Sequence, residues 1–467
     1  MTSTLLRARA TRAAVLGLAV LAAACSDQGA SPLGPTVAPP LAAPKTALAM
    51  LHCQADVRAG SVTCSDASAG EARLYVGGQQ NTDVKLTSDS VSYDAGTQIF
   101  RANLTVQNLL VQRMGSDGST VSGIKVFFNN GPVLTGGTGS VEVNNADGVE
   151  TFTAGSQEYF QYAGSLPYLG VTAPKRWEWH MPPTVQTFSF TLMVSAPLVP
   201  TVVFDMLVSG NRDIYRMGID GQDLTRLTTN TGDDRDPTVA RGKVVFTSHR
   251  DGNAELYRVN LKGGGETRLT TTTDNETSPA LSPDGTRLAF IRNNSSVLGK
   301  LWTSHADSAM SARQATAGFG FSGDVETGPT WFGNAKLAFV STTSGSADVY
   351  SLVPGGSPVK MAGQLNDVGD VDPFWNQDGR LAFASSRSGG TDLYAISAEG
   401  TLSQLSTRTG SDSHPSWLAD GRVLFSCHMG SPRGARICLV TPGTPGAFTE
   451  ITTPGAAERP VAVVDAL

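Results

Sequence analysis

From about residue 204 to the C-terminus, one pattern of residues recurs along the chain. In its clearest copies the unit has a proline, a short strand, an Asp-Gly turn, an apolar strand that ends in Phe, a loop rich in Ser, Arg and Gly, a strand that carries Tyr, and a closing Leu-Thr. The prolines that mark the units lie 42 to 50 residues apart: Pro237, Pro279, Pro329, Pro373, Pro415 and Pro460. Several short strands per unit at this period predict a β-propeller with one four-stranded blade per repeat.

The two ends of the repeat region predict how the ring closes. A blade can bury both faces of its sheet only against its neighbours, so an array of blades must close on itself. The first unit, residues 204–228, has no inner strand before it, whereas the last unit, residues 459–464, supplies an inner strand with nothing after it. We therefore expect the C-terminal strand to complete the first blade, which gives six blades in residues 199–467.

The units resemble a known repeat. Residues 372–383 fit x-P-x-W-x-x-D-G-R-L-A-F, and Asp-Leu-Tyr follows at 392–394. These motifs resemble the WD40-like PD40 repeats of the TolB-type β-propeller, over residues 204–467. The resemblance implies a six-bladed TolB-like propeller and a binding platform in the cell envelope. It does not imply one reaction, because related propellers occur as scaffolds, as lids on peptidases and as a few lyases.

The N-terminus predicts export. Three arginines and no acidic residue occur in the first twelve positions, and the apolar run at 13–24 ends at Cys25. Twelve apolar residues are too few to span a bilayer, which takes about 20, and the pattern is typical of a secretory signal. Residues 21–25, LAAAC, resemble a lipobox, which implies lipid attachment at Cys25. Ser26 rather than Asp follows, so the inner-membrane retention pattern is absent.

These features predict four parts of the chain. Residues 1–24 are expected to be a lipoprotein signal peptide, and residues 25–50 the lipidated Cys and a tether rich in Pro and Ala. An immunoglobulin-like β-sandwich is expected at 51–198 and the propeller at 199–467. The protein would be lipid-anchored in the cell envelope, in the outer membrane, facing either the periplasm or the outside.

The four remaining cysteines fall into two pairs with equal spacing. Cys53 and Cys64 are eleven positions apart, as are Cys427 and Cys438. In an oxidising compartment such short-range pairs favour disulfides. Metal ligation is the alternative, but neither pair is a C-x-x-C and no histidine cluster lies nearby in the sequence. Alignment with the other units predicts that the second pair joins two strands of the last blade.

Residues 51–198 alternate apolar and polar positions in several runs, such as 100–106, 124–128 and 188–194, with Gly-containing turns between them. About seven strands in this region predict an immunoglobulin-like sandwich, although the Cys…Trp…Cys framework of that fold is absent. Trp177 and Trp179, with Tyr159, Phe160 and Tyr162, could either join the core or form an exposed contact surface.

The sequence shows no recognisable catalytic motif. The chain contains no G-x-S-x-G, H-E-x-x-H, P-loop or Rossmann pattern. Of the six histidines, only His414 is expected near the channel mouth. A net charge of −6 gives no electrostatic footprint for nucleic acid. We therefore assign no catalytic residue and expect no nucleic-acid partner.

An acidic residue recurs three positions before the prolines, and the last unit shifts it by one position. We expect these acids to surround one mouth of the channel: Asp234, Glu276, Glu326, Asp370, Asp412 and Glu458. Such a ring would attract Ca²⁺, which prefers carboxylate and carbonyl oxygens, or a basic segment of a partner. The architectural alternative is that each acid accepts hydrogen bonds and holds its blade against the next.

These observations favour a non-catalytic envelope lipoprotein whose propeller presents a face to a protein, a glycan or another ligand. The sequence suggests no cofactor other than Ca²⁺ at the acidic ring. The alternative function is a polysaccharide- or peptide-degrading enzyme, a lyase or hydrolase, with its active site at the channel mouth.

Overall fold

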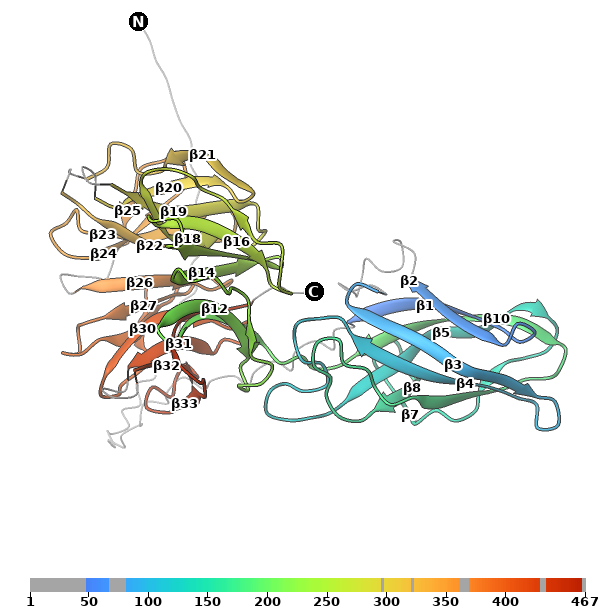
Figure 1. Ribbon diagram of the computed structural model, residues 1–467. Coiled ribbons are helices and arrows are strands. Elements are labelled where there is room, and N and C mark those ends of the chain that lie inside the picture. The colour runs from blue at the N-terminus through green and yellow to red at the C-terminus, as the bar shows by residue number, and fades with distance from the viewer. Residues whose placement is uncertain are drawn as a thin grey trace, which may run out of the picture. The chain divides into compact units, whose positions relative to one another are not determined.

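The structure is a computed structural model that describes residues 48–66, 81–294, 298–320, 323–361, 369–428 and 434–463. The expected signal peptide and Cys25 lie outside these residues. The described chain is built from antiparallel β-strands (Figure 1). Among its elements we find no helix with the length and apolar character of a membrane span.

The N-terminal domain is a sandwich of two antiparallel sheets. The six-stranded sheet has the order β2(Ser61–Asp66), β1(Ala49–Asp56), β10(Val185–Ser195), β5(Ile124–Gly137), β8(Gln157–Tyr162) and β7(Gly148–Glu150). The four-stranded sheet has the order β3(Val84–Asp94), β4(Ile99–Asn108), β9(Lys175–His180) and β6(Glu142–Val143). The ten strands exceed the seven expected, because short edge strands such as β6 and β7 carry no periodic signal.

Aromatic side chains from both sheets fill the sandwich core. Trp177 of β9 packs at 5.6 Å from Phe128 of β5 and stacks at 4.1 Å on Phe160 of β8, measured between ring centroids. Trp177, Trp179 and Phe160 are fully buried. The suggestion of an exposed contact surface is therefore wrong for Trp177, Trp179, Phe160 and Tyr162, which are buried in the core between the two sheets. Tyr159 is half-buried and packs against Phe127 in a separate cluster.

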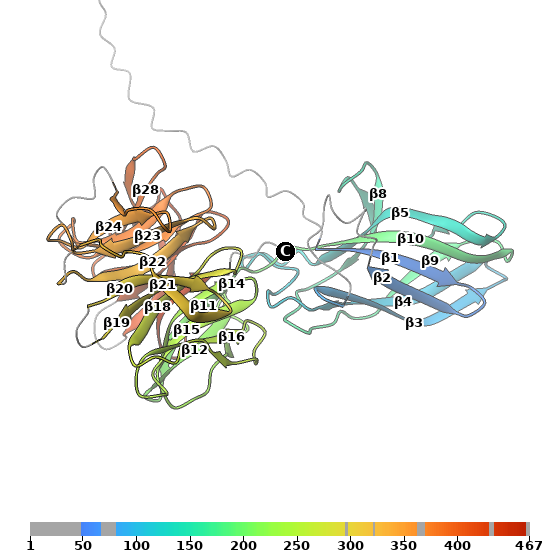
Figure 2. The same cartoon turned by 90° about the horizontal axis from the view of Figure 1, so that it is seen from above.

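The propeller has six four-stranded blades, which Figure 2 shows from above. The first three run from the innermost to the outermost strand as follows. Blade 1 is β34(Ala456–Ala462), β11(Thr201–Val208), β12(Asn211–Gly218), β13(Thr225–Arg226); blade 2 is β14(Asp234–Ala240), β15(Lys243–Ser248), β16(Glu255–Asn260), β17(Thr267–Arg268); blade 3 is β18(Asn275–Leu281), β19(Arg287–Asn293), β20(Lys300–His305), β21(Ser308–Gln314).

The other three blades follow the same order along the chain. Blade 4 is β22(Glu326–Phe332), β23(Lys336–Ser341), β24(Asp348–Leu352), β25(Val359–Lys360); blade 5 is β26(Asp370–Trp375), β27(Leu381–Ser385), β28(Asp392–Ile396), β29(Leu402–Gln404); blade 6 is β30(Ser411–Trp417), β31(Val423–His428), β32(Ala435–Val440), β33(Phe448–Ile451).

Closure of the ring follows the sequence prediction. The C-terminal strand β34 pairs antiparallel with β11 and becomes the innermost strand of blade 1, so the two ends of the repeat region share one sheet. The second strand of each blade, counted from the axis, carries one fully buried phenylalanine: Phe204, Phe246, Phe290, Phe339, Phe383 and Phe425. Burial of each ring contributes about 2–3 kcal/mol to blade packing.

Both cysteine pairs form disulfides. Cys53 and Cys64 lie opposite each other on β1 and β2 and are bonded. Cys427 of β31 is bonded to Cys438 of β32. Cys438 faces Phe425, as Tyr394 faces Phe383 in blade 5, so the bond takes the place of the third-strand aromatic in the last blade. Such bonds are typical of proteins exported to an oxidising compartment.

Candidate functional site

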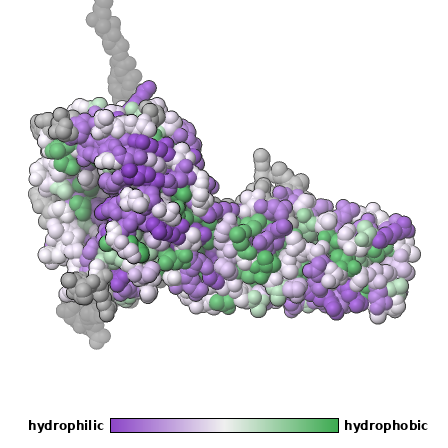
Figure 3. Space-filling model, in the orientation of Figure 1, coloured by the Kyte–Doolittle hydropathy of each residue, from purple (hydrophilic) through white to green (hydrophobic). Residues whose placement is uncertain are grey.

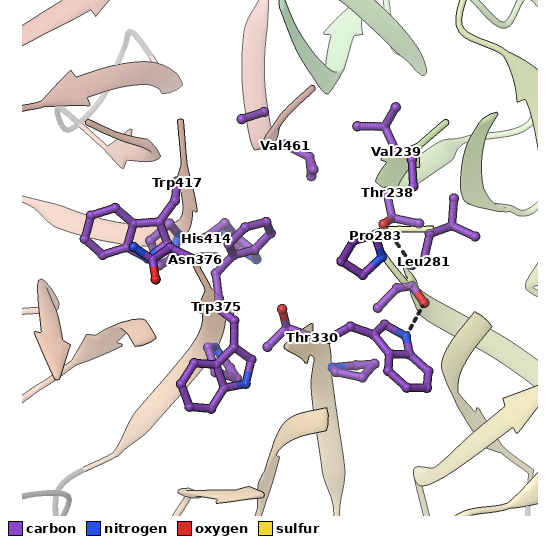
Figure 4. A pocket seen from close by; sticks show the side chains of 18 of the residues that line it. Thr238, Val239, Leu281, Pro283, Thr330, Trp375, Asn376, His414, Trp417 and Val461 are labelled. Carbon is purple, nitrogen blue, oxygen red and sulfur yellow. Dashed lines mark hydrogen bonds between the residues drawn. The ribbon is translucent and has the colours of Figure 1, made fainter. Parts of the chain in front are cut away.

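A cavity of about 890 Å³ lies on the propeller axis, and the innermost strands of all six blades line it. Figure 4 shows Val461, Val239, Thr330, Trp375 and His414 around the same open space. This volume is in the range of small-molecule and peptide-side-chain sites. On the face of the propeller seen in Figure 3, hydrophilic and neutral residues are interspersed with small hydrophobic groups. The cavity is therefore the candidate site.

The backbone of each inner strand is irregular where it meets the cavity. Each of the six innermost strands breaks register with its neighbour at this point, for example between Arg235 and Thr238 in blade 2. At the break, the residue before the repeated proline has a positive φ of 50° to 56° in every blade. This conformation costs non-glycine residues about 1–3 kcal/mol, and bulges of this kind re-aim side chains.

These six residues, one from each blade, all line the cavity, and we call them the axial ring. Its members in blade order are Arg459, Asp236, Ser278, Gly328, Asp372 and His414. The charged and titratable side chains belong to blades 5, 6, 1 and 2, whereas blades 3 and 4 contribute only a serine and a glycine. The ring is therefore strongly asymmetric, although its backbone is repeated.

Arg459 is the most heavily paired member of the axial ring. Its Nε lies 2.7 Å from Asp236 Oδ1, and its Nη1 lies 3.2 Å from Asp205 Oδ2. Arg212 also pairs with Asp205, and its Nη2 lies 3.4 Å from Glu458 Oε1. Burial opposes the charge of Arg459, but Asp236 and Asp205 outweigh it and raise the pKa of the guanidinium. This network joins the C-terminal strand to β11 and to blade 2.

His414 and Asp372 form the second polar pair of the axial ring. His414 Nε2 lies 3.7 Å from Asp372 Oδ2, and the His414 backbone N–H donates to the same oxygen at 3.2 Å. The Ser413 hydroxyl lies 3.0 Å from His414 Nδ1, but Ser413 is not part of the cavity wall. The sequence placed His414 near the channel mouth, and the structure puts it in the cavity.

The acidic ring expected at the channel mouth is not there. Five of its six acids are fully buried, and none of the six is in the cavity wall: Asp234, Glu276, Glu326, Asp370, Asp412 and Glu458. We call the first five the buried acids. They are the first or second residues of the inner strands, and the cavity wall begins one or two residues further along. The sixth, Glu458, is partly exposed and pairs with Arg212 and Arg459.

Each buried acid is already bound to a cation. The nearest contacts are Asp234 Oδ2 to Arg250 Nη2 at 3.1 Å, Glu276 Oε1 to Arg292 Nε at 2.8 Å, Glu326 Oε1 to Lys300 Nζ at 3.6 Å, Asp370 Oδ1 to Arg387 Nη2 at 2.9 Å, and Asp412 Oδ1 to Arg408 Nη2 at 2.5 Å. Burial raises the pKa of all five carboxyls above their ordinary values. The neighbouring cations and hydroxyl donors offset only part of this rise.

Three of these arginines also stack on the third-strand aromatic of their own blade. The guanidinium carbon lies 4.2 Å from the Tyr257 ring centroid for Arg250, 4.3 Å from Trp302 for Arg292, and 4.7 Å from Tyr394 for Arg387. Acid, arginine and aromatic ring therefore form one repeated contact within blades 2, 3 and 5. The architectural alternative explains these acids better than a ligand site does.

The geometry offers no Ca²⁺ site at these acids. Their oxygens are buried and directed to arginine or lysine, and the described residues contain no group of three or more His, Cys, Asp or Glu side chains that could hold a metal ion. A bound cation would have to displace an internal one. The suggestion of Ca²⁺ at the acidic ring therefore finds no support in the arrangement.

The repeated tryptophans two residues after the prolines also lie in the cavity wall. Trp331 is buried, and its Nε1–H donates to the Ala280 carbonyl of blade 3 at 3.0 Å. Trp375 and Trp417 are equally buried, but among the described residues their indole N–H groups have no hydrogen-bond partner. These side chains pack neighbouring blades together.

Sequence reasoning missed Ser278, Gly328 and Arg459 as site residues. A signal was available, because each precedes a repeated proline. The alternation of inward and outward side chains along a strand does not reveal this position, because the bulge changes which side chain faces the axis.

Comparison with known proteins supports the fold. Residues 190–319, just over a quarter of the chain, match the family described as TolB beta propeller domain. The crystal structure of TolB from Acinetobacter baumannii matches 56% of this chain over 66% of its own length, with 14% identity and a TM-score of 0.48. The structure of putative TolB from Agrobacterium tumefaciens also matches 56% of this chain, over 90% of its own length, with 15% identity and a TM-score of 0.44. Dipeptidyl peptidase 4 from Porphyromonas gingivalis matches 54% of this chain over 44% of its own (13%, 0.34).

No curated protein matches the chain. These structural similarities transfer no activity to this chain. The six blades and the matched residues together identify the C-terminal domain of this chain as a TolB-like six-bladed β-propeller.

Proposed function

We propose that this protein is a non-catalytic lipoprotein of the cell envelope whose propeller binds a protein or another ligand in the axial cavity. The observation that carries the proposal is the cavity itself, which is lined by six blades that each present a re-aimed residue on a strained backbone. Strain of this kind is retained where the surrounding structure holds a residue for a task.

The chemistry of the wall favours binding over catalysis. Its acid–base pair is His414 with Asp372, and the nearest hydroxyl to that imidazole, on Ser413, lies outside the wall. A hydrolase would need a nucleophile or an activated water within reach of its general base. The alternative of a polysaccharide- or peptide-degrading enzyme therefore rests on His414 and Asp372 alone, and His414→Gln would abolish its activity.

The binding proposal is tested by narrowing the cavity. Val461 faces the open space in Figure 4, and tryptophan at this position would fill part of it. The matched control is Val359→Trp, at an exposed position on β25 outside the cavity wall. We expect immobilised protein to capture a ligand from an envelope extract, Val461→Trp to lose that capture, and Val359→Trp to keep it. Equal capture by both variants contradicts the proposal.

The anchor is tested separately. Lipid attachment at Cys25 would keep the protein with the membrane fraction, and Cys25→Ser would release it to the soluble envelope fraction. A Cys25→Ser protein that stays with the membrane contradicts lipid anchoring at this residue and leaves the cavity proposal intact.

A further inference from the structure

The axial ring contains one built-in pair of opposite charges between neighbouring blades. Arg459 of blade 1 reaches Asp236 of blade 2, with 2.7 Å between Nε and Oδ1. Both residues directly precede a repeated proline, and their φ values of 51° and 54° show the same backbone conformation. The repeat therefore supplies an internal example of how this ring holds a guanidinium beside a carboxylate.

The same two positions recur between blades 4 and 5, but there the cation is absent from the sequence. Gly328 of blade 4 occupies the position of Arg459, and Asp372 of blade 5 occupies the position of Asp236. A Cβ atom on Gly328 would lie 3.5 Å from Pro373 Cδ and 3.9 Å from Asp372 Cα, which is ordinary van der Waals distance. A Cβ atom therefore fits at position 328 without displacing a neighbour, and Gly328 and Asp372 both line the cavity.

Asp372 has the least compensated charge of the carboxylates in the cavity wall. Asp236 pairs with Arg459, Asp378 with Arg380 and Asp420 with Arg422. Within the described chain, by contrast, no lysine or arginine forms a salt bridge with Asp372, and its basic neighbour is His414, which is charged only when protonated. The Asp372 side chain is 25% exposed, so a ligand can reach it.

We propose that the axial cavity binds a guanidinium or ammonium group of its ligand at Asp372, in the space over Gly328 that corresponds to the Arg459 side chain beside Asp236. The inference deepens the proposed binding function and rests on it. Ser278, the neighbouring ring member in blade 3, also lines the cavity and carries no charge. Phe374 and Trp375 of the same strand also line the cavity and provide apolar wall for the stem of a basic side chain.

The test compares two small probes of equal shape on the full chain. Nα-acetyl-arginine methylamide carries the guanidinium, and Nα-acetyl-citrulline methylamide replaces it with a neutral urea. Titration calorimetry should show the arginine probe binding about tenfold or more tightly than the citrulline probe, because hydrogen bonds to a charged partner are the stronger ones. An Arg residue within a Gly/Ser peptide, used as a third probe, distinguishes a small amine ligand from a chain segment.

Three variants test whether the preference for the arginine probe arises at Asp372. Asp372→Asn should remove the preference for the arginine probe. Gly328→Arg should block the probe by supplying the internal cation, and the other five blades already carry a non-glycine residue in this conformation. Ser278→Arg is the matched control, because the next ring member after Ser278 is Gly328 and not an acid. This variant should therefore still bind the arginine probe, unlike Gly328→Arg, in which the new arginine pairs with Asp372.

The outcomes separate this inference from the function on which it rests. Equal affinity for the two probes, no binding of either, or an unchanged preference in Asp372→Asn overturns the cation site. Capture of an envelope ligand that is lost in Val461→Trp but unaffected by Asp372→Asn would keep the binding function while still rejecting Asp372 as its contact. Loss of the arginine preference in Asp372→Asn, with the circular dichroism spectrum unchanged, supports the site.

Discussion

Two layers of the propeller use neighbouring positions of the same repeat in opposite ways. The buried acids lie two residues before the axial ring in the chain. They are alike in every blade where they occur, fully buried and bound to a cation. The axial ring has the same backbone in all six blades, but its side chains differ from blade to blade and face the cavity. The side chains that recur from blade to blade hold the blades together, whereas the side chains that vary between blades line the candidate site.

The difference has a physical cause. A carboxylate removed from water must be paired, so each buried acid requires its cation and tolerates little change. A side chain at the cavity remains in contact with solvent, and the bulge holds its backbone whatever the residue is. Each blade can therefore carry a different ring residue on the same backbone.

The largest effect is expected from the buried acids. Asp370→Ala leaves the Arg387 guanidinium, whose side chain is 16% exposed, without its anion. Breaking a buried pair in this way should cost about 3–5 kcal/mol of unfolding free energy, measured by urea denaturation followed by circular dichroism. Asp378→Ala at the cavity rim, where the side chain is 77% exposed, should change it by about 0.5 kcal/mol or less. Similar losses in both variants would contradict the contrast.

Blade 6 is expected to depend on its disulfide instead of an aromatic stack. Replacing both Cys427 and Cys438 with alanine should lower the stability of the propeller by about 2–3 kcal/mol, because the eleven-residue separation closes a short loop. The control is the double alanine variant of Cys53 and Cys64, which has the same separation but lies in the sandwich. Differential scanning calorimetry should show only the sandwich transition shifted in that control; a shift of both transitions would argue against independent domains.

The buried acids should also give stability an unusual pH dependence. Burial raises the pKa of Glu326 in the folded state. The folded chain therefore holds the proton of the Glu326 carboxyl more tightly than the unfolded chain does. The resulting contribution to the free energy of unfolding is complete below the ordinary pKa of the carboxyl and is lost as pH rises through its pKa in the folded state. The slope reaches at most about 1.4 kcal/mol per pH unit for one carboxyl. Glu326→Gln should remove this contribution from the pH profile.

Asp117 in the sandwich is the control of opposite sign. Backbone N–H groups of Thr120 and Ser119 lower the pKa of its carboxyl, so its contribution is present above the ordinary pKa and is lost as pH falls. Urea denaturation across this pH range should show that Asp117→Asn and Glu326→Gln change the pH profile in opposite directions. A common direction would contradict the assignment of burial as the dominant cause.

The sequence predicted the propeller well because its signals are local and repeated six times. The prolines, the Phe-ending strands and the incomplete first unit predicted the blades and their closure by residues 459–464. It misplaced Asp234 and its equivalents, because a recurrent acid looks the same in the sequence whether it faces a channel or a buried arginine or lysine of the folded ring. It missed Gly328, because that position has meaning only beside Asp372, and the two are brought together by blades in the folded ring.

A smaller effect is expected from the tryptophans between blades. Trp331→Phe removes the hydrogen bond to the Ala280 carbonyl and should cost about 1 kcal/mol more than Trp375→Phe, whose indole N–H has no partner among the described residues. The volume lost is the same in both variants, so the difference isolates the hydrogen bond. Equal urea midpoints with equal m-values would show that this bond adds nothing to the packing.

The smallest effect on stability is expected in the axial ring. His414→Asn keeps a residue type that tolerates positive φ, and the imidazole is 34% exposed and paired only with Asp372 and Ser413 in the described chain. The unfolding free energy should change by about 0.5 kcal/mol or less, as measured by urea denaturation. A loss as large as that of Asp370→Ala would mean that the ring also holds the blades together. A small loss means that the ring side chains can vary without endangering the fold, and a binding site that differs from blade to blade requires this freedom.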